Sequence, residues 1–149
     1  MSEKFHKEPT YIRGVAQTRS NTSPHASLYA NYVVAGNLVF ISGQTAIDPD
    51  TGCCVANTMQ EQVMIVMEKI DKIMQEVGSS MEYLIKDLII LKDMKDYPVM
   101  RATQQEYYRL HAPALLESPP GSTVLQPHKL VRPYYLLEVE AVGYIPDKK

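Results

Sequence analysis

Two short runs rich in β-branched and aromatic residues open the patterned part of the chain, within residues 29–44. They flank Gly36 and Asn37, a dipeptide that tolerates the positive φ angle of a tight turn. The pattern therefore predicts a β-hairpin. A second turn is predicted in DPDTG, residues 48–52, where proline, aspartate and glycine hold turn-forming positions.

Apolar residues then recur at intervals of three and four from Thr58 to Val77, with polar residues between them. This spacing is typical of an amphipathic helix. Either Thr58 or Asn57 is expected to cap its start, and Gly78 is expected to end it in the left-handed conformation. Several of the apolar positions are methionines, which we interpret as filling of the core and not as a docking surface.

The second half of the chain alternates between strand-like and helix-like patterns. An apolar, β-rich run at residues 84–93 predicts a buried strand. Asp96, followed by Pro98 at a tolerated first-turn position, predicts the start of a second helix. Two final strands are predicted at residues 121–126 and 134–145, on either side of a proline-marked loop at residues 127–133.

The resulting order, β-β-α-β-α-β-β, predicts an α+β fold with two helices packed on one face of a mixed sheet. In the last strand, Leu137, Val139 and Ala141 alternate with Glu138 and Glu140, so one face is aliphatic and the other carries two carboxylates. The carboxylate face is either a plain solvent face or an interface or site. A chain that leaves a broad sheet face bare is expected to oligomerise.

The length of 149 residues suits one domain. Residues 1–27 are polar and interrupted by prolines, and are predicted to form an arm in which residues 11–16 can add one short strand. Residues 28–149 are predicted to form the single domain. The two cysteines, Cys53 and Cys54, are adjacent, which fits neither a disulfide framework nor a zinc site, so we expect ordinary thiols.

Composition and charge argue against nucleic acids and membranes as partners. Fifteen basic against seventeen acidic residues give a formal charge of −2, which argues against nucleic acid as the main partner. No apolar run approaches the roughly 18 residues of a membrane helix, and the charged N-terminus does not resemble a signal peptide. A soluble, cytoplasmic protein without a membrane partner is expected.

The order of elements and five motifs together resemble the RidA family, also called YjgF or L-PSP. The motifs, in chain order, are VAGNLVFISGQ, DPDTG, a helix ending in VGSS, LIKDLIILKDMKDYPVM and LLEVEAVGYI, and the resemblance runs from Leu28 to Ile145. It implies a chorismate-mutase-like fold and a homotrimer whose sheets form a barrel with three clefts between subunits. It also implies hydrolysis of small enamines or imines, such as 2-aminoacrylate, without cofactor or metal.

The resemblance also assigns candidate catalytic residues. Tyr29 falls at the cleft tyrosine of the family, Ser42 at its cleft serine and Glu138 at the glutamate that positions water. Each has a simpler interpretation: an interface aromatic for Tyr29, a strand-end hydroxyl bonded to the backbone for Ser42, and a solvated carboxylate for Glu138. A hydroxyl and a carboxyl group in a dry cleft are what proton transfer in imine hydrolysis requires.

The chain departs from the family at one position. The family's arginine, in a Pro-x-Arg-x-x-Val motif, matches Gly121, so the guanidinium expected to hold a substrate carboxylate is missing. The backbone N–H groups of Gly121 and Ser122 can still contact an anion, and the Thr123 hydroxyl can donate a hydrogen bond. Arg101 matches a cleft asparagine of the family, and is either a relocated cation that binds substrate or a solvated helix residue.

Other cations and histidines are lesser candidates. His128, Lys129 and Arg132 lie in the loop before the last strand, and His25 and His111 have no partner at a catalytic spacing, so both are predicted to be structural. The favoured hypothesis is an enamine or imine deaminase of small-molecule substrates. The alternative is a trimer of the same family that binds or regulates through a small ligand without catalysis. Ribonuclease activity is a weaker third, because no basic aromatic strip is present.

Overall fold

The computed structural model of the protein describes residues 29–48, 53–54 and 56–146. The predicted arm with its optional strand, His25 and most of the predicted turn at residues 48–52 lie outside these residues.

Five strands form one sheet, in the spatial order β1-β2-β5-β3-β4. β3 and β4 pair in parallel and the other pairs are antiparallel, so the predicted mixed sheet is confirmed. The predicted hairpin joins β1 to β2, with Gly36 at a φ of 61° in its turn. The strands are β1 (Tyr32–Ala35), β2 (Leu38–Gln44), β3 (Leu84–Leu91), β4 (Gly121–Leu125) and β5 (Leu137–Tyr144).

The two predicted helices are present and confirm the order β-β-α-β-α-β-β. They are α2 (Met59–Glu76) and α3 (Tyr97–His111). Three short elements were not predicted, because one turn is too short to show a helical period: the 3₁₀ turns η1 (Met81–Tyr83) and η2 (Met94–Asp96) and the short helix α4 (Ala114–Glu117). Among the described helices, none is both long and apolar enough to span a bilayer.

The ends of α2 follow from its sequence. The Thr58 hydroxyl accepts a hydrogen bond from the Glu61 backbone N–H at 3.2 Å, and the Glu61 carboxylate accepts one from the Thr58 N–H at 3.3 Å. This reciprocal pair is a capping box, and it identifies Thr58, not Asn57, as the N-cap. At the other end Gly78 takes a φ of 82°, as predicted.

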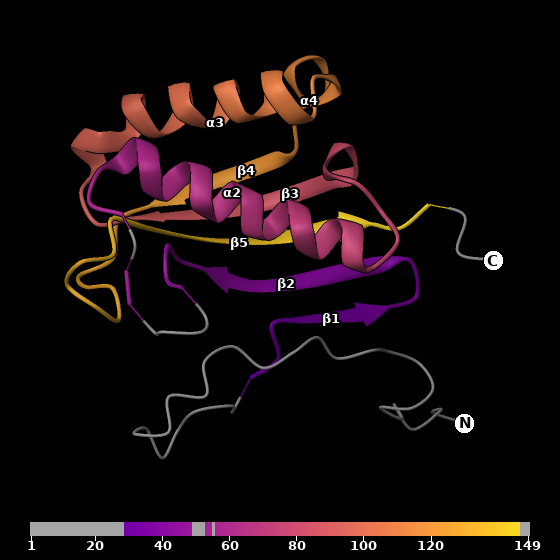
Figure 1. Cartoon of the computed structure of the whole chain (residues 1–149), viewed down its shortest axis with the longest axis horizontal. Helices are drawn as coiled ribbons and strands as arrows, with labels where there is room; N and C mark the ends of the chain where they lie inside the picture. The colour runs from indigo at the N-terminus through magenta and orange to yellow at the C-terminus, as the bar shows by residue number, and fades with distance from the viewer. Residues whose placement is uncertain (1–28, 49–52, 55, 147–149) are drawn as a thin grey trace.

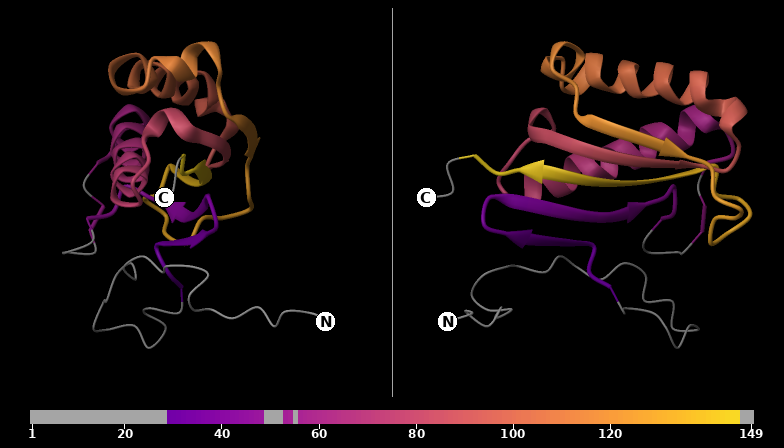
Figure 2. Two further views of the ribbon diagram at one scale, coloured as in Figure 1. Left: turned by 90° about the vertical axis from the view of Figure 1, so that its right-hand side faces the viewer. Right: turned by 180° about the vertical axis from the view of Figure 1, so that it is seen from behind.

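Both helices pack on the same face of the sheet (Figures 1 and 2). In the right-hand view of Figure 2 the sheet faces the viewer and α2 lies behind it. The buried stripe of α2, including Met67 and Met74, packs on the aliphatic face of β5, which carries Leu137, Val139 and Ala141. The methionines are therefore core residues, as predicted.

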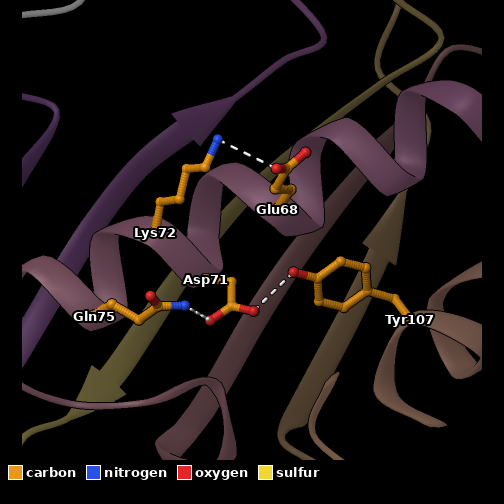
Figure 3. Close-up of polar contacts among 5 residues, drawn as sticks. All are labelled: Glu68, Asp71, Lys72, Gln75 and Tyr107. Carbon is orange, nitrogen blue, oxygen red and sulfur yellow. Dashed lines mark hydrogen bonds and ion pairs between the residues drawn. The ribbon is translucent and has the colours of Figure 1, made fainter. Parts of the chain in front are cut away.

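A polar contact joins the two helices across the core boundary (Figure 3). The Tyr107 hydroxyl on α3 donates to Asp71 Oδ2 on α2 at 2.8 Å, and Gln75 Nε2 donates to Asp71 Oδ1 at 2.9 Å. Burial, together with the Asp71 carboxylate, raises the pKa of Tyr107 well above its usual range, so the phenol stays protonated and keeps donating.

The opposite face of the sheet, which we call the open face, is not covered by any described helix. Large apolar side chains lie on it with substantial exposure, including Phe40 at 46% and Leu125 at 38%. A hollow of about 120 Å³ between Phe40, Leu88, Glu140 and Val142 marks its centre. An apolar surface of this kind normally contacts another protein surface.

Gln62 on α2 ties the helix to the chain that leads into β5. Its side chain is fully buried. Gln62 Nε2 donates to the Tyr134 carbonyl at 3.0 Å and to the Ala56 carbonyl at 3.1 Å, and its Oε1 accepts from the Leu136 N–H at 2.9 Å. The amide thus forms hydrogen bonds with three backbone groups, and its own donor and acceptor are satisfied in the core.

We predict that Gln62→Leu lowers the free energy of unfolding by roughly 2 to 4 kcal/mol, because each buried polar group left unsatisfied costs about 1 to 3 kcal/mol. Gln60→Leu, on the exposed side of the same helix, is the matched control and is expected to change it little. Urea unfolding followed by circular dichroism measures both, and equal stability of the two variants would contradict the prediction.

Candidate functional site

Glu138 lies at an irregularity between β2 and β5. Ile41 pairs with Ala141 and Gln44 pairs with Val139, so two residues of β2 face one residue of β5 and the strand forms a bulge. Ser42 and Gly43 of the bulge face Glu140, and the side chain of Glu138 crosses directly over Gly43, where a Cβ atom would overlap its carboxyl group. The sequence analysis missed Gly43, although a glycine inside a strand pattern signals such a close approach.

The surroundings of Glu138 change its acidity. The side chain is half-buried, and burial, with a further contribution from the neighbouring Glu140, raises the pKa of the Glu138 carboxyl above its ordinary value. A carboxyl group with a raised pKa is better matched to proton transfer near neutral pH than an ordinary glutamate. The interpretation of Glu138 as a simply solvated carboxylate is therefore not supported.

Ser42 is part of the bulge in β2, and Tyr29 lies just before β1. Ser42 directly precedes Gly43, and its hydroxyl donates to the Ala30 carbonyl at 2.6 Å while its N–H donates to the Asn31 carbonyl at 3.0 Å. The hydroxyl proton of Ser42 is thus used in a hydrogen bond to the backbone. The hydroxyl oxygen can still accept a hydrogen bond from water or a ligand. Tyr29 adjoins the same segment and is half exposed.

A second group of candidates lies at the start of β4. Gly121 pairs with Lys86 of β3, and Lys86 Nζ donates to Thr123 Oγ1 at 3.0 Å on the open face. A Cβ atom on Gly121 would lie 3.6 Å from Lys86 Cδ and 3.7 Å from the Ile85 carbonyl, which are ordinary contacts. Packing within the chain therefore does not exclude an arginine at position 121.

Arg101 reaches the same strand from α3. Its Nη2 donates to Ser122 Oγ at 2.8 Å and its Nη1 donates to Gln104 Oε1 at 2.7 Å. Its Nε contacts the Tyr97 hydroxyl at 3.3 Å, and the guanidinium lies 5.4 Å from the centre of the Tyr97 ring. Arg101 is thus held next to the residue that follows Gly121, and it is not a simply solvated helix arginine.

The buried carboxyl group of Asp87 helps to orient Arg101 through Gln104. Gln104 Nε2 donates to Asp87 Oδ2 at 3.1 Å, so Asp87 orients the amide whose oxygen accepts from Arg101. Asp87 is 1% exposed, and its Oδ1 has no hydrogen-bond partner among the described residues. Burial raises the pKa of Asp87, while hydrogen bonds from Ser122 and Gln104 act in the opposite direction. The sequence analysis missed both residues: Asp87 lies within the motif LIKDLIILKDMKDYPVM but was given no role, and Gln104 lies outside the motifs.

The two groups lie on opposite faces of the sheet. Ser122 pairs with Asp87 and shares its face, which is the helix face. Glu138 pairs with Ile90, three residues further along β3, and so lies on the open face. Within the described part of one chain, Arg101 and Glu138 therefore do not form one site.

The remaining candidates have simpler surroundings. The His111 ring lies 4.5 Å from the Tyr107 ring, in keeping with its predicted structural role. The Cys54 thiol donates to the Ala56 carbonyl at 3.2 Å. No group of three His, Cys, Asp or Glu side chains that can hold a metal ion occurs within the part of the chain that the structure describes.

Fold and site together define a class of protein: a small α+β domain with both helices on one face of a mixed sheet and a half-buried carboxyl group on the other. The family described as Endoribonuclease L-PSP matches residues 20–145. The chain is 33% identical over 116 residues to a RutC family protein of Pyrococcus abyssi, which covers 78% of this chain and 85% of that protein.

Two further comparisons indicate the same family. The chain is 23% identical over 86 residues to human 2-iminobutanoate/2-iminopropanoate deaminase, covering 58% of this chain and 63% of that protein. The crystal structure of Escherichia coli TdcF with bound serine superposes with a TM-score of 0.69 at 27% identity, covering 78% of this chain and 87% of the other. The chain belongs to the Endoribonuclease L-PSP family, the RidA or YjgF family that its motifs predicted.

We predict that Gly43→Ala displaces the Glu138 carboxyl group without unfolding the protein, because the overlap falls on the end of a flexible side chain. Displacement towards solvent removes part of the burial, so the pKa of Glu138 should fall towards its ordinary value. Carbon-13 NMR of the labelled glutamate carboxyl groups measures this pKa, with Glu138→Gln to assign the resonance. An unchanged pKa in a folded Gly43→Ala protein would show that Gly43 does not control the carboxyl position.

Proposed function

We propose that the protein is a cofactor-independent hydrolase of small enamines or imines, with its active sites between subunits. The observation that carries this proposal is the Glu138 carboxyl, half-buried on the open face and placed over Gly43. A relative named 2-iminobutanoate/2-iminopropanoate deaminase supports the reaction class. The proposal gives Glu138 and Ser42 roles in handling water, and gives Tyr29 a role in shaping the cleft.

The chemistry needs one water molecule and a series of proton transfers. An enamine first takes a proton at carbon and loses one from nitrogen to become an imine. Water then adds to the carbon of the C=N bond while Glu138 accepts a proton from the water and returns one to the nitrogen. The Ser42 oxygen accepts a hydrogen bond from the water or from the N–H. The carbinolamine then transfers its hydroxyl proton to the nitrogen as the C–N bond breaks, which releases ammonia and leaves a carbonyl compound.

A carboxylate on the substrate needs a cation near Glu138, and Arg101 of the same chain lies on the other face of the sheet. We assign this role to Arg101 of a neighbouring subunit, together with Ser122, the Thr123 hydroxyl and the backbone N–H groups at Gly121. Gln104 and Ser122 already orient the guanidinium. Its remaining N–H groups can donate to a carboxylate in a bidentate contact. TdcF was crystallised with bound serine, a small molecule with a carboxylate, which is in keeping with this class of ligand.

The bare open face supports the same assembly. Phe40 and Val142 lie on it around the central hollow, and no helix among the described residues covers them. We propose that copies of the chain cover this face as a homotrimer. Closing the trimer would bring the Arg101 group of one subunit towards the Glu138 group of the next, which a single chain keeps apart.

A second candidate function is a trimer that binds or regulates through a small ligand without catalysis. The observation that favours it is Gly121, which leaves the position of the family's arginine without a side chain although packing would admit one. In this case the cleft would bind small carboxylates but would not change the decay rate of imines.

We predict that the protein accelerates the decay of freshly generated 2-aminoacrylate and 2-iminobutyrate. Glu138→Gln should lower kcat by about 10²- to 10⁴-fold, because it removes the proton-transfer group. Arg101→Ala should lower kcat/KM mainly through a higher KM, because a uniform binding contact is lost. Arg109→Ala, which breaks an exposed pair with Glu106, is the matched control and should leave both constants unchanged.

Two outcomes of the same assay would contradict parts of the proposal. No acceleration by the wild type and none by Gly121→Arg would exclude imine hydrolysis and favour the binding trimer. Activity that Arg101→Ala leaves unchanged would limit Arg101 to joining α3 and β4.

We predict a molecular mass about three times the 16.8 kDa of one chain by sedimentation equilibrium. Phe40→Glu should lower this mass, because a charge replaces an apolar side chain on the proposed interface. Leu110→Glu is the control, since Leu110 on α3 is exposed to a similar extent, 51% against 46%, but lies on the helix side. A monomeric wild type, or equal masses for both variants, would contradict the proposed assembly.

A further inference from the structure

The loop between β4 and β5 encloses a pocket of about 450 Å³. Lys92, Lys129 and Arg132 contribute cationic side chains to its lining, His128 contributes a fourth basic group, and the lining contains no acidic residue. This is an unusual local composition in a chain whose formal charge is −2. The pocket therefore presents a positive potential inside a concave surface.

The loop that forms this pocket is anchored at its base. The fully buried Gln62 bonds to the backbone of residues 134 and 136, as described above. Lys92 Nζ donates to the Pro133 carbonyl at 2.5 Å, and the Tyr135 side chain at the rear of the pocket is 6% exposed. The pocket is thus built by contacts to α2 and β3, and little ordering is left for a ligand to impose.

Two exposed cations of the pocket form no ion pair within the described part of the chain. Neither Lys129 nor Arg132 forms an ion pair with any residue in the described ranges. Cations that the fold does not neutralise are available to an anion, and a guanidinium recognises carboxylate or phosphate with two parallel hydrogen bonds.

The other walls of the pocket are apolar. Leu130, Val131 and two prolines line it, and Val131 is 79% exposed. The volume is within the range of small-molecule sites, which combine apolar walls with a few convergent polar groups. Such a lining fits an anionic group that is attached to an apolar body, and not an inorganic ion alone.

Tyr135 connects this pocket to Glu138. Tyr135 lines the pocket. Burial raises the pKa of its hydroxyl; the charge of Arg132 acts against this rise, and the charge of Glu138 adds to it. The phenol therefore lies within electrostatic reach of both the loop cation and the candidate catalytic carboxyl.

We propose that this pocket is a binding site for a small organic anion, whose carboxylate or phosphate group is held by Arg132 and Lys129 and whose apolar body lies against Leu130 and Val131. The proposal does not depend on imine hydrolysis.

The test is titration of the nitrogen-15-labelled full-length protein with 3-phenylpropionate, phenyl phosphate and the neutral analogue 3-phenylpropionamide. We expect saturable shifts of the backbone amides of residues 128–136 with at least one of the two anions, and weaker binding of the neutral amide. The stronger of the two anions identifies the head group. Because the readout is binding, a protein without imine hydrolysis tests the site equally well.

The variant Arg132→Gln/Lys129→Gln should weaken anion binding by about tenfold or more, because two charge-assisted contacts are lost. Arg132→Lys, which keeps the charge, should retain more affinity than Arg132→Gln, and Arg109→Gln on the distant helix should bind like the wild type. The proposal is overturned by equal binding of the neutral amide, by unchanged affinity in the double variant with its fold intact, or by no saturable shift in the loop with either anion.

Discussion

Both helices cover the same face of the sheet, and most other features of the molecule depend on this arrangement. Side chains alternate between faces along each strand, so every strand divides its residues between a filled core and an open surface. β5 puts Leu137, Val139 and Ala141 against α2 and turns Glu138 and Glu140 away from it. The aliphatic side stabilises the fold, and the carboxylate side is free to carry chemistry.

The same division between the two faces of the sheet separates the Arg101 guanidinium from the Glu138 carboxyl group. β4 is an edge strand, so α3 reaches its helix face through Arg101 and Ser122, while Lys86 and Thr123 meet on the other face. A guanidinium on position 121 would extend from the open face, next to Lys86. Arg101 instead approaches from behind the strand, and a second copy of the chain is the simplest way to place it opposite Glu138. In the proposed trimer, the lack of a side chain at Gly121 and the placement of Arg101 opposite Glu138 are therefore linked.

Periodicity and turn chemistry predicted the order of elements, the hairpin, the ends of α2 and the methionine core, because each of these is determined by residues close together in the sequence. Motifs identified Glu138 and Ser42. The contacts of these residues were not predictable. The overlap of Glu138 with Gly43 depends on the register of β5 against β2, and the support of Arg101 by Asp87 depends on the parallel pairing of β3 with β4. Register between distant strands is set by the whole sheet and leaves no local pattern in the sequence.

The buried carboxyl group of Asp87 and the half-buried one of Glu138 have raised pKa values, and they lie on opposite faces of the sheet. A raised folded-state pKa means that the folded protein holds the proton more tightly than the unfolded chain does. The stability that each protonated group contributes is fully present below its ordinary pKa and is lost as the pH rises through the raised value. At neutral pH each group thus opposes folding, and an apolar or amide side chain would be better for stability alone. Groups that reduce stability at working pH are concentrated where function requires them. The role proposed for Glu138 agrees with this explanation, and Asp87 agrees with it through Gln104, which it orients towards Arg101.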